Sequence, residues 1–472
     1  MQQKSVLAEG RGAPYTGAMR LALEVALARG VGRLSRLAGA GGGTTLPGKL
    51  LAAVDRDAVD ALAARLPDGS ALVSATNGKT TTCALASAVL GQSHRLARNS
   101  AGANLMSGVA STLVSSAGAE LGLFEVDEAA LPEVARRVRP RVVSLGNLFR
   151  DQLDRYGELE IVADRWRRMI PELPEESVLV VNGDDPLVGA LAAEHANSVR
   201  FGVDDPTQAR PDLQHAADSK YCLRCGTPYE YAAAYVGHLG DYRCPACGHA
   251  RPPLDVAARN IELRGTEGAA FDLVTADGTL RVELALPGLY NVYNALAAAS
   301  LCRALGTSRA EIAEGLGRAR PAFGRFERIE LDGRTLLLLL IKNPAGANEA
   351  LRTVVSAGAP RLAVVALNDA IADGRDVSWI WDVDFELLGA GLDRLIASGD
   401  RAAELALRFK YGGMDASAIE VVPDLSEALD RGLALTEPGD ELVCLPTYTA
   451  MLGLQAIVTR RGHAPPYWER AA

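Results

Sequence analysis

Residues 71–82 read Ala-Leu-Val-Ser-Ala-Thr-Asn-Gly-Lys-Thr-Thr-Thr. The run from Ala71 to Ser74 is typical of a buried strand, and the residues from Thr82 to Leu90 are typical of a helix. At such a junction, backbone N–H groups and the helix dipole hold phosphate oxygens, a lysine neutralises them, and a hydroxyl can ligate magnesium. The stretch therefore predicts a site for a nucleoside triphosphate, ATP with Mg²⁺, that is formed by Thr76, Asn77, Gly78, Lys79, Thr80 and Thr81.

The loop departs from the full P-loop pattern, which has a glycine five residues before Gly78 where this chain has Val73. An ordinary helix start with a chance Gly-Lys-Thr is the alternative. The surrounding sequence favours the nucleotide site, because strands and helices alternate around it. Residues 121–126, 142–145 and 177–182 read as buried parallel strands. The chain is therefore predicted to be an α/β protein with a parallel-rich sheet and ligands at the strand carboxyl ends.

The same alternation returns near the C-terminus, with predicted strands at residues 336–341, 362–367, 394–397 and 441–445. We expect a disordered lead-in at 1–17 without the apolar core of a secretory signal, and a central ATP-binding domain at 18–323. Residues 324–472 are expected to form a C-terminal Rossmann-like α/β domain. Residues 261–286 show alternating apolar and polar side chains between Asp-Gly turns, and this pattern predicts a small antiparallel hairpin pair.

The composition excludes several classes of protein. With 472 residues, 48% hydrophobic and 23% charged, the chain has the make-up of a globular protein with more than one core. Its net charge of −9 argues against nucleic acid as a partner. No stretch reads as a membrane span. Seven cysteines in so long a chain are not a disulfide scaffold, which favours the reducing cytoplasm.

Four cysteines form two knuckles in a segment, about 204–253, that interrupts the strand–helix alternation as an insertion. The pairs are Cys222–Cys225 and Cys244–Cys247, and a glycine follows each pair. This spacing is typical of a zinc ribbon with four thiolate ligands. Because four thiolates complete the coordination of Zn²⁺, the predicted zinc is structural.

Five ordered strings resemble the Mur ligase superfamily; they lie at residues 75–82, 182–186, 287–295, 324–327 and 343–344. The resemblance implies that Asn291 reaches the adenosine and that Arg325 approaches the phosphates. It makes Glu125 the first magnesium ligand beside Thr80, and Glu128 the second candidate. A solvated acidic loop is the alternative for both glutamates.

Two departures argue against an ordinary amino-acid-adding ligase. Many Mur ligases have a histidine where this chain has Gln152, and they carry a carbamoylated lysine about fourteen residues further on. Here residues 164–168 contain no lysine. An amino-acid-adding Mur ligase or a folylpolyglutamate-type ligase is the first alternative function. A non-catalytic zinc-ribbon scaffold with residual ATP binding is the second.

Residues 368–385 concentrate five aspartates and two tryptophans, and together with the zinc ribbon they resemble the MurT family of Mur-ligase-like subunits. The resemblance implies ATP-dependent amidation of the D-glutamate α-carboxylate in the lipid II stem peptide, through an acyl phosphate. A GatD-type glutaminase would supply the ammonia, in the cytoplasm at the inner face of the membrane.

The same resemblance implies that one C-terminal aspartate completes the Cys-His pair of the partner. Asp376 is the first choice, followed by Asp373 and Asp382, and turn or capping roles are the alternative. Trp379 and Trp381 are predicted to alternate on a strand or extended loop, either as core or as interface anchors.

The remaining cysteines bear on the source of the ammonia. Cys83, Cys302 and Cys444 lie in apolar surroundings without a glycine-flanked nucleophile elbow, which predicts core packing. The chain is therefore not expected to contain a glutaminase nucleophile of its own.

Overall fold

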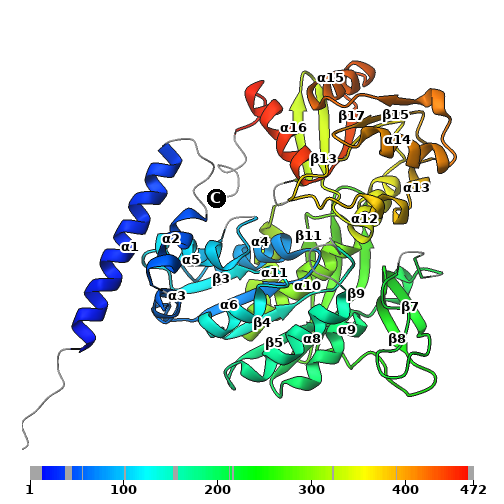
Figure 1. Cartoon of the computed structure of the whole chain (residues 1–472). Helices are drawn as coiled ribbons and strands as arrows, with labels where there is room; N and C mark the ends of the chain where they lie inside the picture. Colours follow the sequence, from blue (N-terminus) through cyan, green and yellow to red (C-terminus); the bar gives the residue numbers. More distant parts are fainter. Residues whose placement is uncertain are drawn as a thin grey trace, which may run out of the picture.

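The computed structural model describes residues 13–37, 45–55, 57–99, 102–151, 158–211, 213–214, 217–320, 324–389 and 391–465. Two α/β parts follow one another along the chain and lie against each other (Figure 1). The β7–β8 hairpin stands at one side of the central part, and α1 projects from the other side (Figure 1). The predicted α/β class with parallel-rich sheets is confirmed.

A nine-stranded sheet forms the central part, in the order β11-β10-β9-β6-β5-β4-β1-β3-β2. All its neighbours from β9 to β2 pair in parallel, and only β9, β10 and β11 pair antiparallel. The strands are β1 (Ser70–Ser74), β2 (Leu96–Arg98), β3 (Leu121–Glu125), β4 (Val142–Leu145), β5 (Val178–Asn182), β6 (Ser198–Val203), β9 (Val256–Leu263), β10 (Ala269–Thr275) and β11 (Gly278–Leu284).

Helices cover this sheet, and apolar clusters fill the space on each side of it. Nearly all of α10 is buried, and it packs on α4 and on the sheet, which brings its N-terminus to the nucleotide loop. The helices are α1 (Ala13–Leu37), α2 (Leu46–Val54), α3 (Ala58–Ala63), α4 (Lys79–Leu90), α5 (Met106–Ser115), α6 (Leu131–Val138), α8 (Leu159–Met169), α9 (Pro186–Gly189), α10 (Leu289–Ala304) and α11 (Arg309–Arg318), with 3-10 turns η1 (Ile170–Glu172), η2 (Ala190–Glu194) and η3 (Pro206–Gln208).

The insertion contains a two-stranded antiparallel hairpin, β7 (Glu230–Val236) and β8 (Leu239–Arg243). It connects β6 to β9, and these two strands are parallel neighbours in the large sheet. The insertion therefore fills the place of a crossover connection, which parallel neighbours require.

The C-terminal part is a six-stranded sheet in the order β12-β13-β17-β14-β15-β16, parallel except for the β12–β13 pair. Apolar clusters lie on both of its faces. The elements are β12 (Arg325–Leu331), β13 (Arg334–Leu339), α12 (Pro344–Ser356), β14 (Leu362–Ala366), η4 (Ser378–Asp382), α13 (Glu386–Gly389), β15 (Arg394–Ser398), α14 (Ala402–Tyr411), η5 (Ala416–Ala418), β16 (Ile419–Val421), α15 (Leu425–Leu435), β17 (Glu441–Pro446) and α16 (Tyr448–Arg460).

Several elements differ from the predictions. Residues 1–12 of the predicted lead-in lie outside the described residues, and α1 begins at Ala13, so residues 13–17 are helical. The antiparallel pairing predicted at 261–286 is confirmed by β9, β10 and β11, and these strands also extend the large sheet, because β9 pairs with β6. Strand β12 precedes the predicted first C-terminal strand. The strand or loop expected at Trp379 and Trp381 is wrong, because both residues lie in the 3-10 helix η4.

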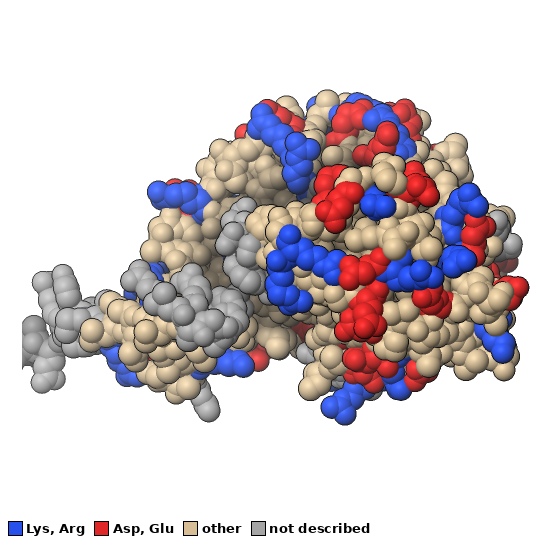
Figure 2. All heavy atoms as spheres, turned by 90° about the horizontal axis from the view of Figure 1, so that it is seen from above, with Lys and Arg blue, Asp and Glu red and all other residues tan. Residues whose placement is uncertain are grey.

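The surface carries both signs of charge. Lys and Arg side chains are interleaved with Asp and Glu over the face in Figure 2. None of the helices in the described part of the chain combines the length and apolar character that a bilayer crossing requires.

Candidate active site at the domain junction

The loop between β1 and α4 requires glycine at its last position. Gly78 has a φ of 91°, in the left-handed region, and a Cβ atom there would lie 1.9 Å from Asn294 Oδ1. Both observations exclude a side chain at residue 78. Helix α4 starts at the next residue, so its free N–H groups face the loop, as the sequence predicts for a phosphate site.

Lys79 lies inside the loop. Its Nζ donates a hydrogen bond to Ala75 O and forms an ion pair with Glu128, with 2.8 Å between Nζ and Oε2. Both side chains are buried. Thr80, on the first turn of α4, is half-buried. The structure thus brings Lys79 and Glu128 together at the N-terminus of α4.

Asn147 holds the loop in place, although no motif pointed to it. Its Oδ1 accepts from Asn77 N at 2.9 Å, and its Nδ2 donates to Asn77 O at 3.0 Å. Thr76 N donates to Asn147 O at 2.8 Å, and Thr76 Oγ1 accepts from Phe149 N at 3.1 Å. The sequence signal for Asn147 was its position, two residues after the end of the buried strand β4, where parallel sheets place ligand-binding side chains.

A pocket opens beside the loop, between the central and C-terminal parts. Its polar lining residues include Asn77 and Gly78 of the loop, Thr81 of α4, Asn294 of α10 and Glu349 of α12. Asn291, expected to reach the adenosine, is not among the lining residues. It binds Asn294 instead, with 2.9 Å between Asn294 Nδ2 and Asn291 Oδ1, and donates to Pro287 O at 2.7 Å. Asn294 is the α10 amide at the pocket, and Asn291 positions it.

The C-terminal part meets the loop through an amide pair. Asn343 Nδ2 donates to Asn77 Oδ1 at 3.0 Å, and Asn77 Nδ2 donates to Asn343 Oδ1 at 3.2 Å. Asn343 also caps α12, accepting from Gly346 N at 2.9 Å. The backbone of Arg325 starts β12, opposite Leu339. The side chain of Arg325 lies outside the described part of the structure.

Carboxylates surround the loop without forming a cluster. Glu125, at the end of β3, is buried, and its backbone is bound to the side chain of Asn99. Asp151 pairs with Lys342 of the C-terminal part, at 2.5 Å between Oδ2 and Nζ, and burial raises its pKa despite that lysine. Within the described residues, Glu125 and Glu128 do not join a third carboxylate, histidine or cysteine at metal-binding distance.

The four knuckle cysteines meet at one point. Their Sγ atoms all lie within 4.8 Å of one another, as a shared metal ion requires. Cys222 Sγ is 3.5 Å from Cys247 Sγ, and Cys225 Sγ is 3.4 Å from Cys244 Sγ. The group could hold a metal ion, and four thiolates suit Zn²⁺.

The three C-terminal aspartates have different surroundings. Asp373 is buried and accepts from both Thr449 N (2.8 Å) and Thr449 Oγ1 (2.5 Å), and burial raises its pKa. Asp376 is exposed, and its bonds with Ser378 lower its pKa. Asp382 is exposed and lies 3.7 Å from Arg150 of the central part, measured from Oδ2 to Nη2. Of these three aspartates, Asp376 is exposed and forms no ion pair with a basic side chain among the described residues.

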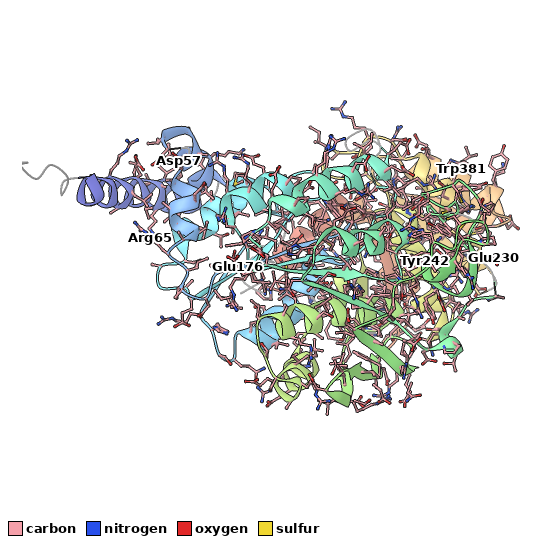
Figure 3. All side chains as sticks on the ribbon, turned by 90° about the horizontal axis from the view of Figure 1, so that it is seen from below. Asp57, Arg65, Glu176, Glu230, Tyr242 and Trp381 are labelled. Carbon is pink, nitrogen blue, oxygen red and sulfur yellow. The ribbon has the colours of Figure 1, made fainter. Side chains whose placement is uncertain are left out.

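Trp381, which follows Asp376 closely in the sequence, forms an exposed aromatic pair with Tyr411. Trp381 is 50% exposed and Tyr411 is 73% exposed, with ring centroids 6.1 Å apart. Arg408 lies under Trp381, 5.7 Å from the ring centroid. Figure 3 shows Trp381 at the same end of the molecule as Glu230 and Tyr242, which lie in the β7–β8 hairpin. Trp379 instead packs against the C-terminal core, because η4 turns the two indoles in different directions.

Comparison with known proteins identifies the family. The family model described as Mur ligase middle domain matches residues 73–302, and that described as MurT ligase C-terminal matches residues 340–451. The MurT subunit of lipid II isoglutaminyl synthase (glutamine-hydrolyzing) from Streptococcus pneumoniae is 33% identical, over 91% of this chain and 94% of the relative. The chain belongs to the MurT family. The Staphylococcus aureus MurT subunit is 31% identical, over 87% of this chain and 91% of the relative.

Solved structures show that this MurT-family chain has the fold of Mur ligases. A pseudomurein peptide ligase type C from Methanothermus fervidus is 22% identical with a TM-score of 0.66, covering 85% of this chain and 80% of that one. MurF from Thermotoga maritima, in complex with ADP, is 15% identical with a TM-score of 0.60, covering 88% and 85%. At these identities the likeness supports the fold alone.

The three cysteines outside the knuckles are buried, as predicted. Burial raises the pKa of the Cys83 thiol well above its ordinary value and that of Cys444 to about 12. Neutral, enclosed thiols are poor nucleophiles. None of the three is therefore suited to hydrolyse glutamine.

Proposed function

We propose that the chain is the ATP-dependent subunit of a lipid II isoglutaminyl synthase. It would amidate the α-carboxylate of D-glutamate in the lipid II stem peptide to give D-isoglutamine. The observation that carries the proposal is the match with MurT subunits along nearly the whole of both chains. The match includes the C-terminal part, which distinguishes MurT from amino-acid-adding ligases.

The chemistry divides into two balanced steps. A carboxylate oxygen attacks the γ-phosphorus of ATP, and the bond from that phosphorus to the β-phosphate oxygen breaks. ADP departs, and the carboxylate has become an acyl phosphate. Ammonia then attacks the acyl carbon, loses a proton, and displaces inorganic phosphate as the amide forms. The first step requires positive groups that neutralise the charge of the phosphates. The second step requires that ammonia, and not water, reaches the acyl phosphate.

The residues at the domain junction suit these tasks. Lys79 and the N–H groups at the start of α4 would hold the phosphates, and Arg325 would approach them from the C-terminal part. Magnesium, held by Thr80 with Glu125 or Glu128, would neutralise charge on the phosphate oxygens. Asn294, positioned by Asn291, would contact the nucleoside.

A structural Zn²⁺ would be held by Cys222, Cys225, Cys244 and Cys247, whose sulfur atoms fit a tetrahedral site. The proposed domains follow the two sheets: residues 18–323 with the insertion at about 204–253, and residues 324–472.

We further infer that a GatD-type glutaminase supplies the ammonia and docks on the C-terminal part. The exposed Trp381 and Tyr411 are suited to anchor a protein interface. Asp376, exposed and ionised, would orient the imidazole of the partner's Cys-His pair. Because lipid II is at the inner face of the membrane, the complex would work in the cytoplasm at that surface.

The proposal is tested by co-expressing the chain with a glutaminase partner and supplying lipid II, ATP and glutamine. We expect an amidated product, lighter by about one mass unit than the acid because an amide NH₂ replaces OH, and none from Lys79→Ala. Free amino acids in place of glutamine should give no adduct. Amino-acid adducts, or the absence of amidated product from the wild-type complex, would refute the proposal.

A further inference from the structure

The tip of the zinc-ribbon hairpin forms one wall of the nucleotide pocket. Val236 and Leu239, the last pair of residues in the β7–β8 register, both line the pocket. They are 4% and 1% exposed, and both belong to the apolar cluster of the central part. The pocket therefore depends on a hairpin that comes from the insertion and not from the α/β core.

The other end of the hairpin has a separate small core built around the metal ligands. Cys222 and Cys244 are buried with Tyr229 and Tyr242 in a cluster of their own. Tyr242 is directly opposite Tyr231 in the hairpin register. The ribbon is thus anchored at two ends, one by the four sulfur atoms and one by the pocket.

Contacts at the tip fix its position. His238, in the turn, is fully buried and lies 4.6 Å from the ring of Phe149, which also lines the pocket. Its Nε2 is 3.4 Å from Asp185 Oδ2, and Asp185 in turn accepts from Leu148 N at 2.9 Å. A Cβ atom on Gly237 would lie 2.7 Å from Phe149, so the turn is closely fitted to the segment after β4.

We propose that the tip of the zinc ribbon is a nucleotide-binding element, in which Val236 and Leu239 contact the base or ribose of an adenine nucleotide. Zinc occupancy of the knuckles and nucleotide binding at the loop are thereby coupled. This inference rests on the proposed function, since it takes the pocket beside Gly78 as the nucleotide site.

The coupling follows from the stability of a two-stranded hairpin. An isolated hairpin is at best marginally stable in water, and structural zinc supplies folding free energy. Zinc orders the hairpin from its knuckle end, and a nucleotide orders it from its tip. Each ligand therefore lowers the cost of ordering for the other, and the effect must be reciprocal.

The test uses the full-length chain, with zinc content measured by mass spectrometry and Mg-ADP as the probe in calorimetry. Leu239→Ala should weaken ADP binding roughly 10-fold at full zinc content, since a pocket loses apolar contacts. Leu239→Met, which keeps the volume, should stay within about threefold of wild type. Leu263→Ala, an exposed leucine of β9, is the matched control and should bind ADP as wild type does.

A second measurement follows zinc release, and its main comparison is made within the wild-type chain. Zinc release to a chromogenic chelator should be about 10-fold slower in saturating ADP for the wild-type chain, and ADP should give little protection to Leu239→Ala. Equal affinity of Leu239→Ala for ADP at full zinc content, or zinc release that ADP does not slow, overturns the inference. If Leu239→Ala loses zinc or fails to fold, the wild-type release rates decide alone. Failure of wild-type protein to bind ADP at all would instead refute the proposed function.

Discussion

At the scale of single residues, burial separates side chains that the sequence presents as equivalent. Asp373, Asp376 and Asp382 lie within ten residues, yet one is buried against Thr449, one is exposed, and one faces Arg150. A carboxylate that must reach another chain has to be accessible. The structure therefore favours Asp376 for the role that the sequence proposed.

We expect Asp376→Asn to lower glutamine-dependent amidation by about 1,000-fold, because an amide cannot stabilise the charged imidazole of the partner. Amidation with added ammonium salt should be unchanged, because free ammonia does not depend on the partner's glutaminase site and the ATP-dependent step does not use Asp376. Comparing the two nitrogen sources in the same assay checks this. Asp373→Asn should instead lower the stability by about 1–3 kcal/mol through its bonds to Thr449. If Asp382→Asn alone shows the selective loss, the assignment is wrong.

A second prediction for a single residue concerns the effect of Asp184 on stability as the pH changes. It is fully buried, and burial raises its pKa from 3.8 to about 6, against Arg251 and the hydrogen bond from Tyr293. Because the folded state holds the proton more tightly than the unfolded state, Asp184 stabilises the fold at low pH. This stabilisation is lost as the pH rises from about 4 through about 6.

Asp184→Asn removes this titration. As the pH rises from 4 to 6, the wild type should therefore lose on the order of 3 kcal/mol of unfolding free energy relative to the variant. Above pH 7 the difference between the two proteins should be constant. Urea denaturation of both proteins across this range measures the difference, in which other titrating groups cancel. A difference that does not vary with pH would contradict the prediction.

At the scale of elements, the apolar runs identify most strands because parallel strands are buried on both faces. The sequence pattern fails where an element depends on its neighbours. Residues 261–286 are predicted as an antiparallel hairpin pair, which β9, β10 and β11 confirm, but the pattern does not show that β9 also pairs with β6 and joins the large sheet. The tryptophans alternate as they would in a strand, but both lie in the 3-10 helix η4, and Asp376 Oδ1 accepts from the N–H of Ser378, its first residue.

Helix α12 allows a prediction about domain closure. Asn343 caps the helix and also pairs with Asn77 of the nucleotide loop. Asn343→Ser keeps a capping oxygen but is too short to reach Asn77, so we expect stability within about 0.5 kcal/mol of wild type. The KM for ATP should rise several-fold, because the loop loses its contact with the C-terminal part.

Asn343→Ala is the matched comparison, since it loses both the cap and the amide pair. It should show the same rise in KM and lower the free energy of unfolding by about 1 kcal/mol more than the serine variant. Thermal melts and ATP titrations of the two variants separate the effects. An unchanged KM in both would show that the amide pair does not support nucleotide binding.

At the scale of the whole molecule, side chains from the insertion, the loop and the C-terminal part meet around one pocket. Arg210 joins the insertion to the C-terminal part, because its N–H donates to Ala234 O of β7 at 2.8 Å and its guanidinium pairs with Glu349 of α12. Glu349 is buried and lines the nucleotide pocket. A buried ion pair beside the site is thus one of the contacts that hold the two parts together.

We expect Arg210→Met to lower the free energy of unfolding by about 3 kcal/mol, because it leaves the Glu349 carboxylate buried without its main cation. Arg264→Met removes an exposed arginine paired with Glu283 and should cost less than about 1 kcal/mol. Urea denaturation followed by tryptophan fluorescence compares the two. Equal losses would show that the junction is not held by this pair.

The sequence by itself determined the α/β class and the two cysteine knuckles, and it predicted the nucleotide loop at residues 76–81, because these depend on local spacing and on residue chemistry. It also identified the buried cysteines, since apolar surroundings are visible in the chain. The tertiary structure alone decided that Asn294 lines the pocket while Asn291 supports it, that Asn147 clamps the loop, and that the ribbon tip forms a wall. These relations join residues far apart in sequence, so packing fixes them and no local pattern records them.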